Sequence, residues 1–563
     1  METALQETFT QKTGKKVKQF AQTNPKDATL TLTFFTVSFI ALFVGAVLGL
    51  LQGLERAGLL TMPAWFDYYQ TLTTHGILLI LVFTGTFLVG YVYAGVSHVL
   101  GGLLPKVRKM GWIAFGLMVA GTVLTASQVI IGEASVLYTF YPPMAASPWF
   151  YIGLVLIVLG IWTAAFGMFI NVANWRKNHK GQKLPLFAFF GTGIFTLLFT
   201  ATLGVTYEVL TLIPWAFGWT ETVNVLLSRT LFWSFGHTLV NVWYFTAVSA
   251  WYVAFPKIIG GKTFSDTLAR VVAVLIVILN VPGGFHHQII DPGFTEGLKY
   301  MHVFMSLSIG FPSLMTAFAM FAIMERAGRR KGGKGLLGWF KKLPWGDVRF
   351  LSLFLAMATF IPAGAGGIAQ TNFQLNQVVH NTLFITGHFH LTVGVTVAVS
   401  FFGIAYWLVP HLSKRVMTPK MNKLAIWQVI LWMVGMFFMS GAMHTVGLFG
   451  APRRTAFSTY FDSAQAAGWS PYLMLLAVGG TLLIISVIMV VYIVFHLMFK
   501  APKGETEFPV AEEEEDASPT PKWTERWSLW VVLMIAVIAM GYVIPVVDLV
   551  MNAPPGSPPF KTW

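Results

Sequence analysis

The chain has 563 residues, of which 55% are hydrophobic and 11% are charged, and its mean hydropathy is +0.67. This composition excludes a water-soluble globular protein and is typical of a polytopic membrane protein. The formal net charge of +14 is spread over many loops, which argues against a nucleic-acid-binding face. The absence of cysteine excludes iron–sulfur clusters, thiolate copper sites and covalent haem attachment within this polypeptide.

Apolar segments long enough to cross a bilayer follow one another along the chain. We expect an all-α polytopic bundle of about 13 transmembrane helices, and the segments are 29–52, 69–96, 110–131, 148–174, 185–217, 226–256, 268–287, 299–324, 349–368, 377–410, 424–449, 471–499 and 524–551. The expected organisation has four parts. They are a basic N-terminal segment (1–28), a core of spans 1 to 12 (29–503), an acidic linker (504–523), and span 13 with a C-terminal tail (524–563).

Basic residues predict how the bundle is oriented. The segment before the first span contains Lys12, Lys15, Lys16, Lys18 and Lys26, and every second loop after it is rich in Lys and Arg. The alternate loops nearly lack basic residues. By the positive-inside rule, the N-terminus and the acidic linker are cytoplasmic and the C-terminus is external. We therefore expect a multi-pass protein in the plasma membrane of a prokaryote.

Histidines give the clearest chemical signal inside the apolar segments. His75 lies near the outer end of the second segment, where a lone imidazole could equally serve to bind a backbone carbonyl. His237 lies in the sixth segment, and His286 and His287 close the seventh, directly after a Pro-Gly-Gly sequence. The proline and glycines break the helix, so that adjacent side chains can converge. Three neutral nitrogens without a neighbouring carboxylate or thiolate suit copper or zinc.

The tenth segment contains His388-Phe389-His390. Residues two apart on an α-helix project about 200° apart, so each imidazole can bind a separate iron on its own side of the helix. His390 lies at an outer depth comparable to that of His75, and two imidazoles from facing helices form a low-spin haem site. His388 would then hold a five-coordinate iron with one position open for a gas. The pattern predicts a buried multi-metal redox centre.

These motifs resemble subunit I of the haem–copper respiratory oxidase superfamily, and within it the B-type cytochrome c oxidases. The resemblance covers nearly the whole chain and rests on LTTHGILL, RTLFWSFGH, GFHHQIIDPG, PSLMTAF, VVHNTLFITGHFHLTVG and APRRTAF. It implies three cofactors: a low-spin haem, a high-spin haem and the copper ion CuB. The implied ligands are His75 and His390 for the low-spin haem, His388 for the high-spin haem, and His237, His286 and His287 for CuB.

The resemblance implies further site residues. Those expected near the haem propionates, which need cationic partners so close to hydrocarbon, are Arg453, Arg454 and His380. Those that match the B-type proton path from the cytoplasm are Tyr252, Ser313 and Thr316. Val248 stands where that path usually has another tyrosine, so the route is expected to be interrupted or filled with water.

The resemblance also implies partners. With no cysteine in this chain, electrons would arrive through a subunit II-like partner that has a CuA or cytochrome domain, from a cytochrome c-type donor. The remaining expected partners are the lipid bilayer and a diatomic gas, O2 or NO. We expect no nucleic-acid partner.

One departure from the family bears on the choice of gas. Oxygen-reducing members have a cross-linked tyrosine four residues after the first copper histidine, on the same helix face. Here that position is Asn241, and the position used by another branch is Asn280. Cleaving dioxygen in one step needs four electrons, of which the phenol supplies the last, whereas reducing two nitric oxide molecules needs two.

We therefore favour reduction of NO to N2O, in an offshoot that lacks the phenol, with Asn241 donating a hydrogen bond to a bound oxyanion. Reduction of O2 to water with proton translocation is the alternative. A membrane transporter is a distant alternative, because it would not explain the paired histidines.

Overall fold

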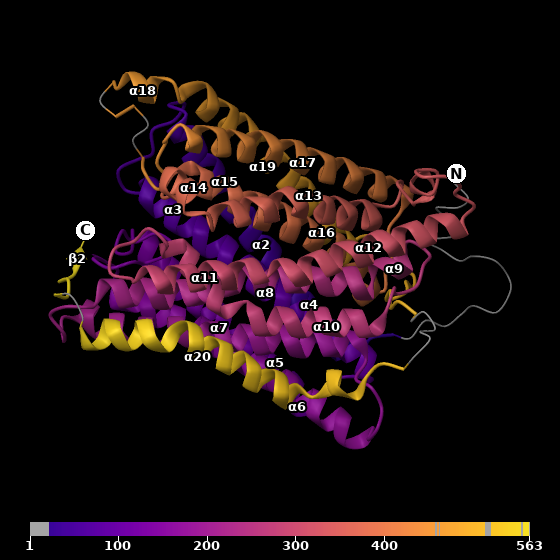
Figure 1. Cartoon of the computed structure of the whole chain (residues 1–563). Coiled ribbons are helices and arrows are strands. Elements are labelled where there is room, and N and C mark those ends of the chain that lie inside the picture. Colours follow the sequence, from indigo (N-terminus) through magenta and orange to yellow (C-terminus); the bar gives the residue numbers. More distant parts are fainter. Residues whose placement is uncertain (1–21, 457–458, 461, 513–518, 553–554, 562–563) are drawn as a thin grey trace.

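The structure, a computed structural model, describes residues 22–456, 459–460, 462–512, 519–552 and 555–561. Long helices lie side by side and form one elongated bundle (Figure 1). The residues Lys12 to Lys18, used above to orient the chain, and Glu513 to Glu515 of the acidic linker lie outside the described residues.

The all-α class is confirmed, since the described part of the chain is built from helices and one two-residue strand pair. The helices of the first half are α2 (Pro25–Arg56), α3 (Tyr68–Ile77), η1 (Leu78–Phe83), α4 (Thr84–Leu100), α5 (Pro105–Ile130), α6 (Pro148–Asn178), α7 (Leu186–Phe217), α8 (Val225–Val253), α9 (Phe255–Ile258), α10 (Asp266–Leu279) and η2 (Val281–Gln288).

The second half continues the same pattern. It contains α11 (Glu296–Ser308), α12 (Gly310–Arg330), η3 (Phe340–Lys342), α13 (Val348–Gln370), α14 (Phe373–Val379), α15 (Leu383–Leu391), η4 (Thr392–Val397), α16 (Ala398–Ser413), α17 (Pro419–Leu448), α18 (Ala464–Ala467), α19 (Ser470–Phe499), η5 (Lys522–Glu525) and α20 (Trp527–Met551). Strand β1 (Met144–Ala145) pairs with β2 (Phe560–Lys561) and ties the C-terminal tail to the loop before α6.

The expected count of 13 spans is not confirmed. Within the described ranges, 11 helices are long and apolar enough to cross a membrane, or 12 if α10 and η2, bent by 50°, form one span. The remaining expected segment, 226–256, is occupied by the 29-residue helix α8. Its Trp, Tyr, Ser, His and Asn side chains lower its hydropathy below that of the other long helices, so it is not counted among them.

Two spans are locally widened next to histidines. In the span from α3 to α4, the π-helical turn η1 starts three residues after His75. In the span from α15 to α16, the π-helical turn η4 starts two residues after His390. A π-turn admits an extra residue and changes which face the flanking side chains present, and such turns are frequent at functional sites.

The seventh predicted segment breaks where the sequence indicates. Helix α10 ends at Leu279, and the following turn η2 is a 3-10 helix that begins just before Pro282. The two helices meet at a bend of 50°, and the ring centroids of His286 and His287 lie 4.2 Å apart. This break brings both histidines to face α8, against which η2 packs.

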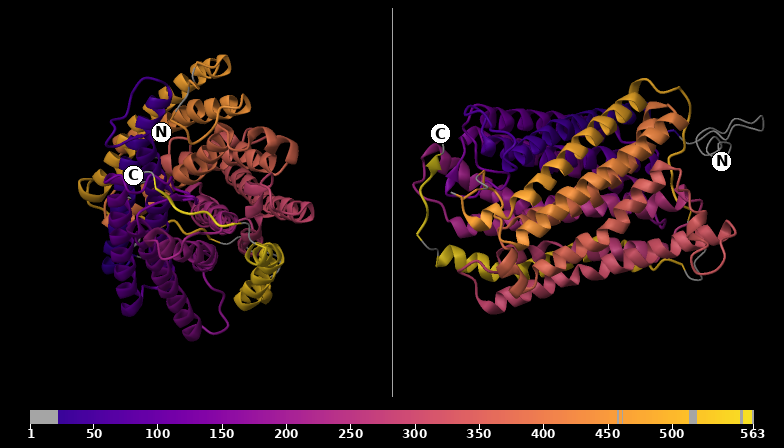
Figure 2. Two further views of the ribbon diagram at one scale, coloured as in Figure 1. Left: turned by 90° about the vertical axis from the view of Figure 1, so that its left-hand side faces the viewer. Right: turned by 90° about the horizontal axis from the view of Figure 1, so that it is seen from above.

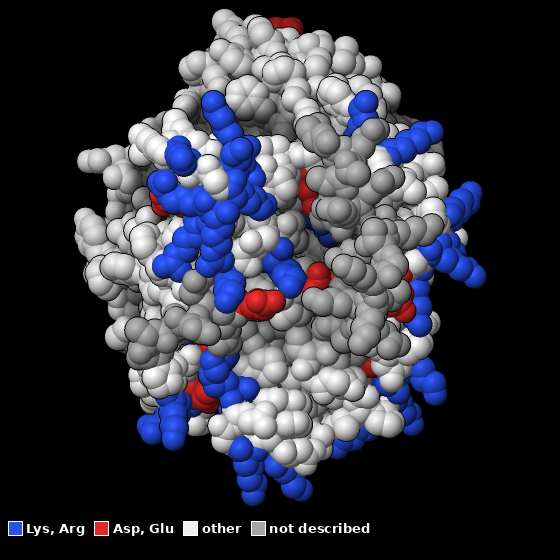
Figure 3. All heavy atoms as spheres, turned by 90° about the vertical axis from the view of Figure 1, so that its right-hand side faces the viewer, with Lys and Arg blue, Asp and Glu red and all other residues white. Residues whose placement is uncertain are grey.

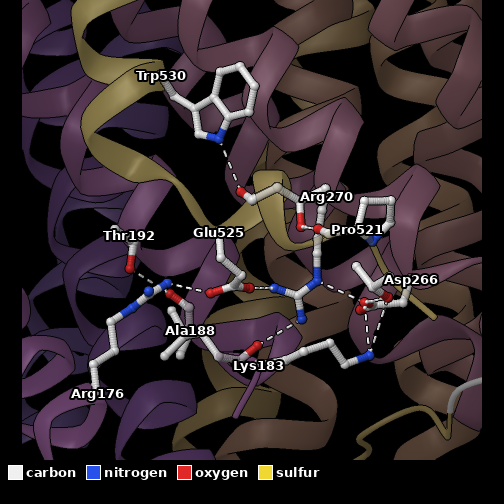
Figure 4. Close-up of polar contacts among 12 residues, drawn as sticks. Arg176, Lys183, Ala188, Thr192, Asp266, Arg270, Pro521, Glu525 and Trp530 are labelled. Carbon is white, nitrogen blue, oxygen red and sulfur yellow. Dashed lines mark hydrogen bonds and ion pairs between the residues drawn. The ribbon is translucent and has the colours of Figure 1, made fainter. Parts of the chain in front are cut away.

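A buried ion network anchors the last span, α20, which lies at the periphery of the bundle (Figure 2). Arg270 of α10 is 1% exposed and binds Asp266 at 2.8 Å. Glu525, in the turn before α20, contacts both Arg270 and Arg176, and Lys183 reaches Asp266 at 3.2 Å (Figure 4). Three cations and two carboxylates therefore join α6, α10 and the start of α20.

We predict that Glu525→Gln destabilises the protein by about 2–3 kcal/mol, because removing one partner from a buried ion pair leaves an uncompensated charge. Arg270, which is nearly inaccessible to water, would then have Asp266 as its one remaining carboxylate partner among the described residues. Thermal unfolding of the detergent-solubilised protein measures the effect. The matched control is Glu296→Gln, since Glu296 is 67% exposed and pairs with Lys299 on the surface. An unchanged melting temperature for Glu525→Gln would show that the network does not hold α20.

Candidate haem and copper site

Three histidines from two elements converge in the middle of the bundle. The ligand nitrogens of His237 (α8), His286 and His287 (η2) lie within 4.8 Å of one another. The ring centroids of His237 and His286 are 4.7 Å apart, and those of His286 and His287 are 4.2 Å apart. Imidazole nitrogens bind copper or zinc at about 2.0–2.1 Å, so this cluster can close around a single ion.

Neighbouring side chains orient this cluster. The Nδ1 atom of His286 lies 3.0 Å from the Ser306 hydroxyl, which itself donates to the carbonyls of His302 and Gly283. The indole of Trp233 stacks on His287, with ring centroids 3.7 Å apart and planes 6° from parallel. Hydrogen bonds to the non-ligating nitrogen and packing against the ring fix the tautomer and orientation of a metal-binding histidine.

His75 (α3) and His390 (α15) face each other across a gap. Their rings are nearly parallel, at 16°, with centroids 6.4 Å apart. A gap of this width holds one metal ion with a bond of about 2 Å to each ring. Each Nδ1 is hydrogen-bonded to a backbone carbonyl, that of Gly45 at 2.7 Å for His75 and that of Thr386 at 2.8 Å for His390. The Nε2 atoms are therefore free to act as ligands.

Glycines leave room for these rings. A Cβ at Gly49 would lie 2.7 Å from the ring of His75, so only glycine fits the face of α2 that contacts this histidine. His388 lies against Gly366 and Gly367 of α13, where added Cβ atoms would come within 3.0 Å and 3.3 Å of its ring. Its Nδ1 is buried and has no hydrogen-bond partner among the described residues. The ring of His388 thus lies in a space that two glycines of α13 leave open.

One cavity of about 450 Å³ connects these histidines. Its wall includes both rings of the facing pair, His388, all three clustered histidines and Asn241, and the rest of the wall is mostly apolar. The cavity is therefore one continuous site in which separate groups can be held close together. A haem-sized, largely apolar ligand with a few charged ends fits such a site.

Two arginines that line this cavity keep some of their donors unused among the residues that the structure describes. The Nε atoms of Arg453 and Arg454, and one terminal nitrogen of Arg454, are buried without a hydrogen-bond acceptor within the described part of the chain. Arg453 does donate to the Asn381 side chain at 2.9 Å, and the Arg454 guanidinium lies over the rings of Tyr138 and Tyr141. An unpaired buried guanidinium is costly, so these donors fit an anionic group such as a carboxylate.

The backbone at Arg454 supports this interpretation. Its φ of +62° lies in the left-handed region that side-chain-bearing residues rarely adopt, and Asn381, to which Arg453 is bonded, has a φ of +58°. Strained backbone of this kind persists where the surroundings impose it, often at ligand sites.

His380 lies beside this arginine pair but binds elsewhere. Its Nε2 is 3.6 Å from a carboxylate oxygen of Asp291, and the other oxygen of Asp291 forms an ion pair with Arg229 at 2.8 Å. Arg229 and Arg454 both lie over the ring of Tyr141, so this ion pair adjoins the arginine pair.

Asn241 lies one turn from His237 on α8. Its amide nitrogen donates to the His237 carbonyl at 2.9 Å and lies 3.3 Å from Nε2 of the same histidine. The side chain of Asn241 thus lies directly beside the imidazole of His237, which is a candidate metal ligand.

The three predicted proton-path residues lie on two adjacent helices. The hydroxyl of Tyr252 (α8) donates to Thr316 (α12) at 3.4 Å. Thr316 donates to the Pro312 carbonyl, and Ser313 donates to the Ile309 carbonyl and also lines the cavity. Tyr252 and Thr316 are in contact, and Ser313 is the member that reaches the cavity.

Several residues of the site were missed in the sequence. Trp233, Ser306 and the two tyrosines beneath Arg454 have no motif that separates them from ordinary core residues. Arg56 is different: it is 5% exposed, lines the cavity, donates to the Pro452 carbonyl and keeps a buried Nε without an acceptor among the described residues. A lone arginine at the end of an apolar span was the signal that could have identified it.

Comparison with known proteins identifies the family. Residues 29–482 match the family model described as "Cytochrome C and Quinol oxidase polypeptide I". The chain is 34% identical over 548 residues to cytochrome c oxidase subunit 1 of Thermus thermophilus, covering 95% of this chain and 96% of that protein. It is 26% identical over 496 residues to cytochrome c oxidase subunit 1 of Corynebacterium glutamicum, covering 83% and 78% respectively.

A solved structure agrees with these matches. The chain superimposes with a TM-score of 0.89 and 33% identity on a chain from the cryo-EM structure of a heme-copper terminal oxidase dimer, covering 95% of each. The donor set described above fits the groups that such proteins hold. The chain therefore belongs to the haem–copper oxidase subunit I family, whose members are oxidoreductases that carry a low-spin haem, a high-spin haem and CuB.

Proposed function

We propose that this chain is the catalytic subunit of a terminal respiratory oxidase that reduces O2 to water. The observation that carries the proposal is the single cavity that joins the facing pair His75 and His390, the uncommitted His388, and the three-histidine cluster. The matched relatives are named cytochrome c oxidase subunit 1, which favours dioxygen over the nitric oxide we expected from the sequence. Membership of the B-type branch stays a prediction.

The geometry supports a ligand role for each histidine. His75 and His390 would hold the low-spin haem, since both ring nitrogens not facing the gap are already bonded to carbonyls. His388 would be the axial ligand of the high-spin haem. His237, His286 and His287 would hold CuB, and Arg453 and Arg454 would pair with haem propionates.

The bound haems and copper would supply the electrons and the binding position for the gas. The chain itself would position the metal-binding side chains and set the electrostatic environment of the cavity. Ser306 and Trp233 hold the orientations of His286 and His287, so that the three nitrogens stay directed at one point. The mostly apolar wall limits water near the reacting gas and strengthens each electrostatic interaction inside. Tyr252, Thr316 and Ser313 would bring protons from the cytoplasmic side.

Orientation and partners are part of the proposal. The end of the bundle where α12 finishes carries many Lys and Arg side chains and few acidic ones (Figure 3). By the positive-inside rule this end would be cytoplasmic, in the plasma membrane of a prokaryote. The absence of cysteine leaves electron entry to a subunit II-like partner with a CuA or cytochrome domain, fed by a cytochrome c-type donor.

Nitric oxide reduction is the second candidate, and the position of Asn241 favours it. The amide lies against the His237 ring where oxygen-reducing relatives have a phenol, and an amide supplies no electron. Two-electron reduction of NO to N2O would need none. The two candidates share every ligand and differ only in the electrons required at this position.

We predict that the purified complex, supplied with one electron donor, consumes O2 faster than NO at equal gas concentration. Parallel electrode measurements of both gases on the same preparation test this. Faster NO consumption with N2O as the product would replace the first candidate by the second. An enzyme lacking both activities, while retaining both haems and copper, would contradict the proposed function as a whole.

We predict that single histidine substitutions remove different cofactors. His390→Ala should abolish the low-spin haem spectrum while leaving copper bound, and His237→Ala should remove copper while leaving that spectrum intact, since the two sites share no ligand. Optical spectra and metal analysis distinguish these outcomes. His496→Ala, in α19 and away from the cavity lining, is the control and should retain both. Loss of copper from His390→Ala with the haem spectrum unchanged would reverse the assignment.

We predict that Arg454→Gly weakens haem retention roughly tenfold, because charge-assisted hydrogen bonds contribute about 1.5–3 kcal/mol. Glycine accepts the positive φ at this position, so the backbone strain is relieved while the charge is lost. The rate of haem transfer to an apoprotein acceptor measures the effect. Arg326→Gly, on α12 outside the cavity lining, serves as the comparison. Equal haem transfer from both variants would exclude a role for Arg454 in holding propionates.

A further inference from the structure

Tyr244 is a buried phenol at the edge of the central cavity that no motif assigns. It lies on α8, seven residues after His237, and is 5% exposed. Its ring stacks on Phe360 of α13, with centroids 4.3 Å apart and planes 15° from parallel, and packs edge-on against Trp251 at 5.9 Å. Tyr244, Asn241 and Ser313 all line the cavity. Packing on both sides holds the phenol in one orientation.

The hydroxyl of Tyr244 has no direct hydrogen-bond partner among the residues the structure describes. Leaving a buried hydroxyl unpaired costs about 1–3 kcal/mol, so the group calls for an explanation. Its polar neighbours include the hydroxyls of Ser313 and Thr316 on helix α12. Both give their own protons to carbonyls of α12, at 3.1 Å and 2.8 Å, which leaves their oxygens able to accept.

The same helix face carries the hydroxyl that leads toward the cytoplasm. Residues 244, 248 and 252 are spaced at i, i+4 and i+8, so they lie one above another along α8. Tyr252 donates to Thr316 at 3.4 Å, whereas Val248, between the two tyrosines, offers no proton-carrying group. Because Thr316 lies near both phenols, the route can cross to α12 and return to α8 above Val248.

We propose that Tyr244 is the last proton-transferring side chain before the cavity, and that it replaces the phenol missing at position 248. This rests on the proposed function, because gas reduction at the metal centre consumes the protons. In each transfer the Thr316 hydroxyl turns from its carbonyl, gives its proton to the Tyr244 oxygen and takes a replacement proton from Tyr252, while Tyr244 releases its own proton into the cavity beside Asn241. The phenol is unchanged afterwards, and no electron leaves it.

The arrangement also predicts where the proton is delivered. Asn241 is one turn closer to the metal cluster than Tyr244 on the same helix face, and its amide contacts His237. The distance from residue 244 to residue 237 along the axis is roughly 10 Å. Tyr244 therefore serves the cavity without touching a metal ligand, and water in the cavity would complete the transfer.

The test uses the complete purified complex with Tyr244→Phe, which keeps the stacked ring and removes only the hydroxyl. We expect gas turnover to fall at least about tenfold, as loss of a positioned proton-transfer group typically does. Haem spectra, copper content and the rate of electron entry into the low-spin haem should stay unchanged, and the solvent deuterium isotope effect on turnover should rise. Tyr93→Phe is the matched control, because its buried hydroxyl donates to the Ala164 carbonyl away from the cavity.

A double variant makes the test specific. Tyr244→Phe with Val248→Tyr returns a phenol to the other position on the same face, and we expect it to recover most of the lost turnover. Normal turnover and isotope effect in Tyr244→Phe would overturn the proposal. Loss of haem, loss of copper or slow electron entry would also overturn it, since each indicates a structural or electron-transfer role.

Proton uptake separates this proposal from the proposed function. When the metals are reduced chemically without gas, wild-type protein should take up protons from the cytoplasmic side faster than Tyr244→Phe, as followed with a pH-sensitive dye in vesicles. A slow variant supports Tyr244 even in a protein that reduces neither gas, whereas equal uptake rates count against it.

Discussion

The arrangement of this protein depends on the cost of burying polar groups without partners in an apolar bundle. A membrane interior offers no water to satisfy them, so histidines and arginines there must bind something else. The Nε atoms of Arg453 and Arg454 are buried without an acceptor within the described residues, and both side chains line one cavity with His388. The haems and copper ion of this family would supply partners there: irons and copper for imidazoles, and propionates for guanidiniums.

Interruptions of regular helix place the ligands. The bend between α10 and η2 turns adjacent histidines toward one neighbour, α8, and the π-turns η1 and η4 begin three and two residues after the facing histidines His75 and His390. Each interruption leaves backbone groups that a straight helix would satisfy, and is tolerated in a membrane because packed neighbours and side chains satisfy them instead. Gly49, Gly366 and Gly367 leave space for histidine rings, because a Cβ at any of these positions would lie within 3.3 Å of the ring of His75 or His388.

Helix α8 shows how the demands of a membrane span and of a reaction site compete. It is 29 residues long and mostly buried, yet its polar residues make it less hydropathic than the spans around it. Shielded from lipid by neighbouring helices, it can carry His237, Asn241, Tyr244 and Tyr252 along one side. The same shielding lets hydroxyls of α8 and α12 lie next to each other beside the cavity.

The sequence by itself determined the fold class and the family, and it singled out the six histidines that the structure gathers around one cavity, because long apolar segments and paired histidines in hydrocarbon have few alternative explanations. Its count of 13 spans is not confirmed, because the polar side chains of α8 lower the hydropathy of that helix below that of the other long helices. The placement of His380 near the arginine pair stays a prediction, and its contact with Asp291, from a different loop, had no signal in the sequence. The positions of Trp233, Ser306 and Tyr244 were decided only by tertiary structure. Their roles depend on which helices are neighbours, and stacking on a ring or facing a hydroxyl across helices leaves no periodic signal along the chain.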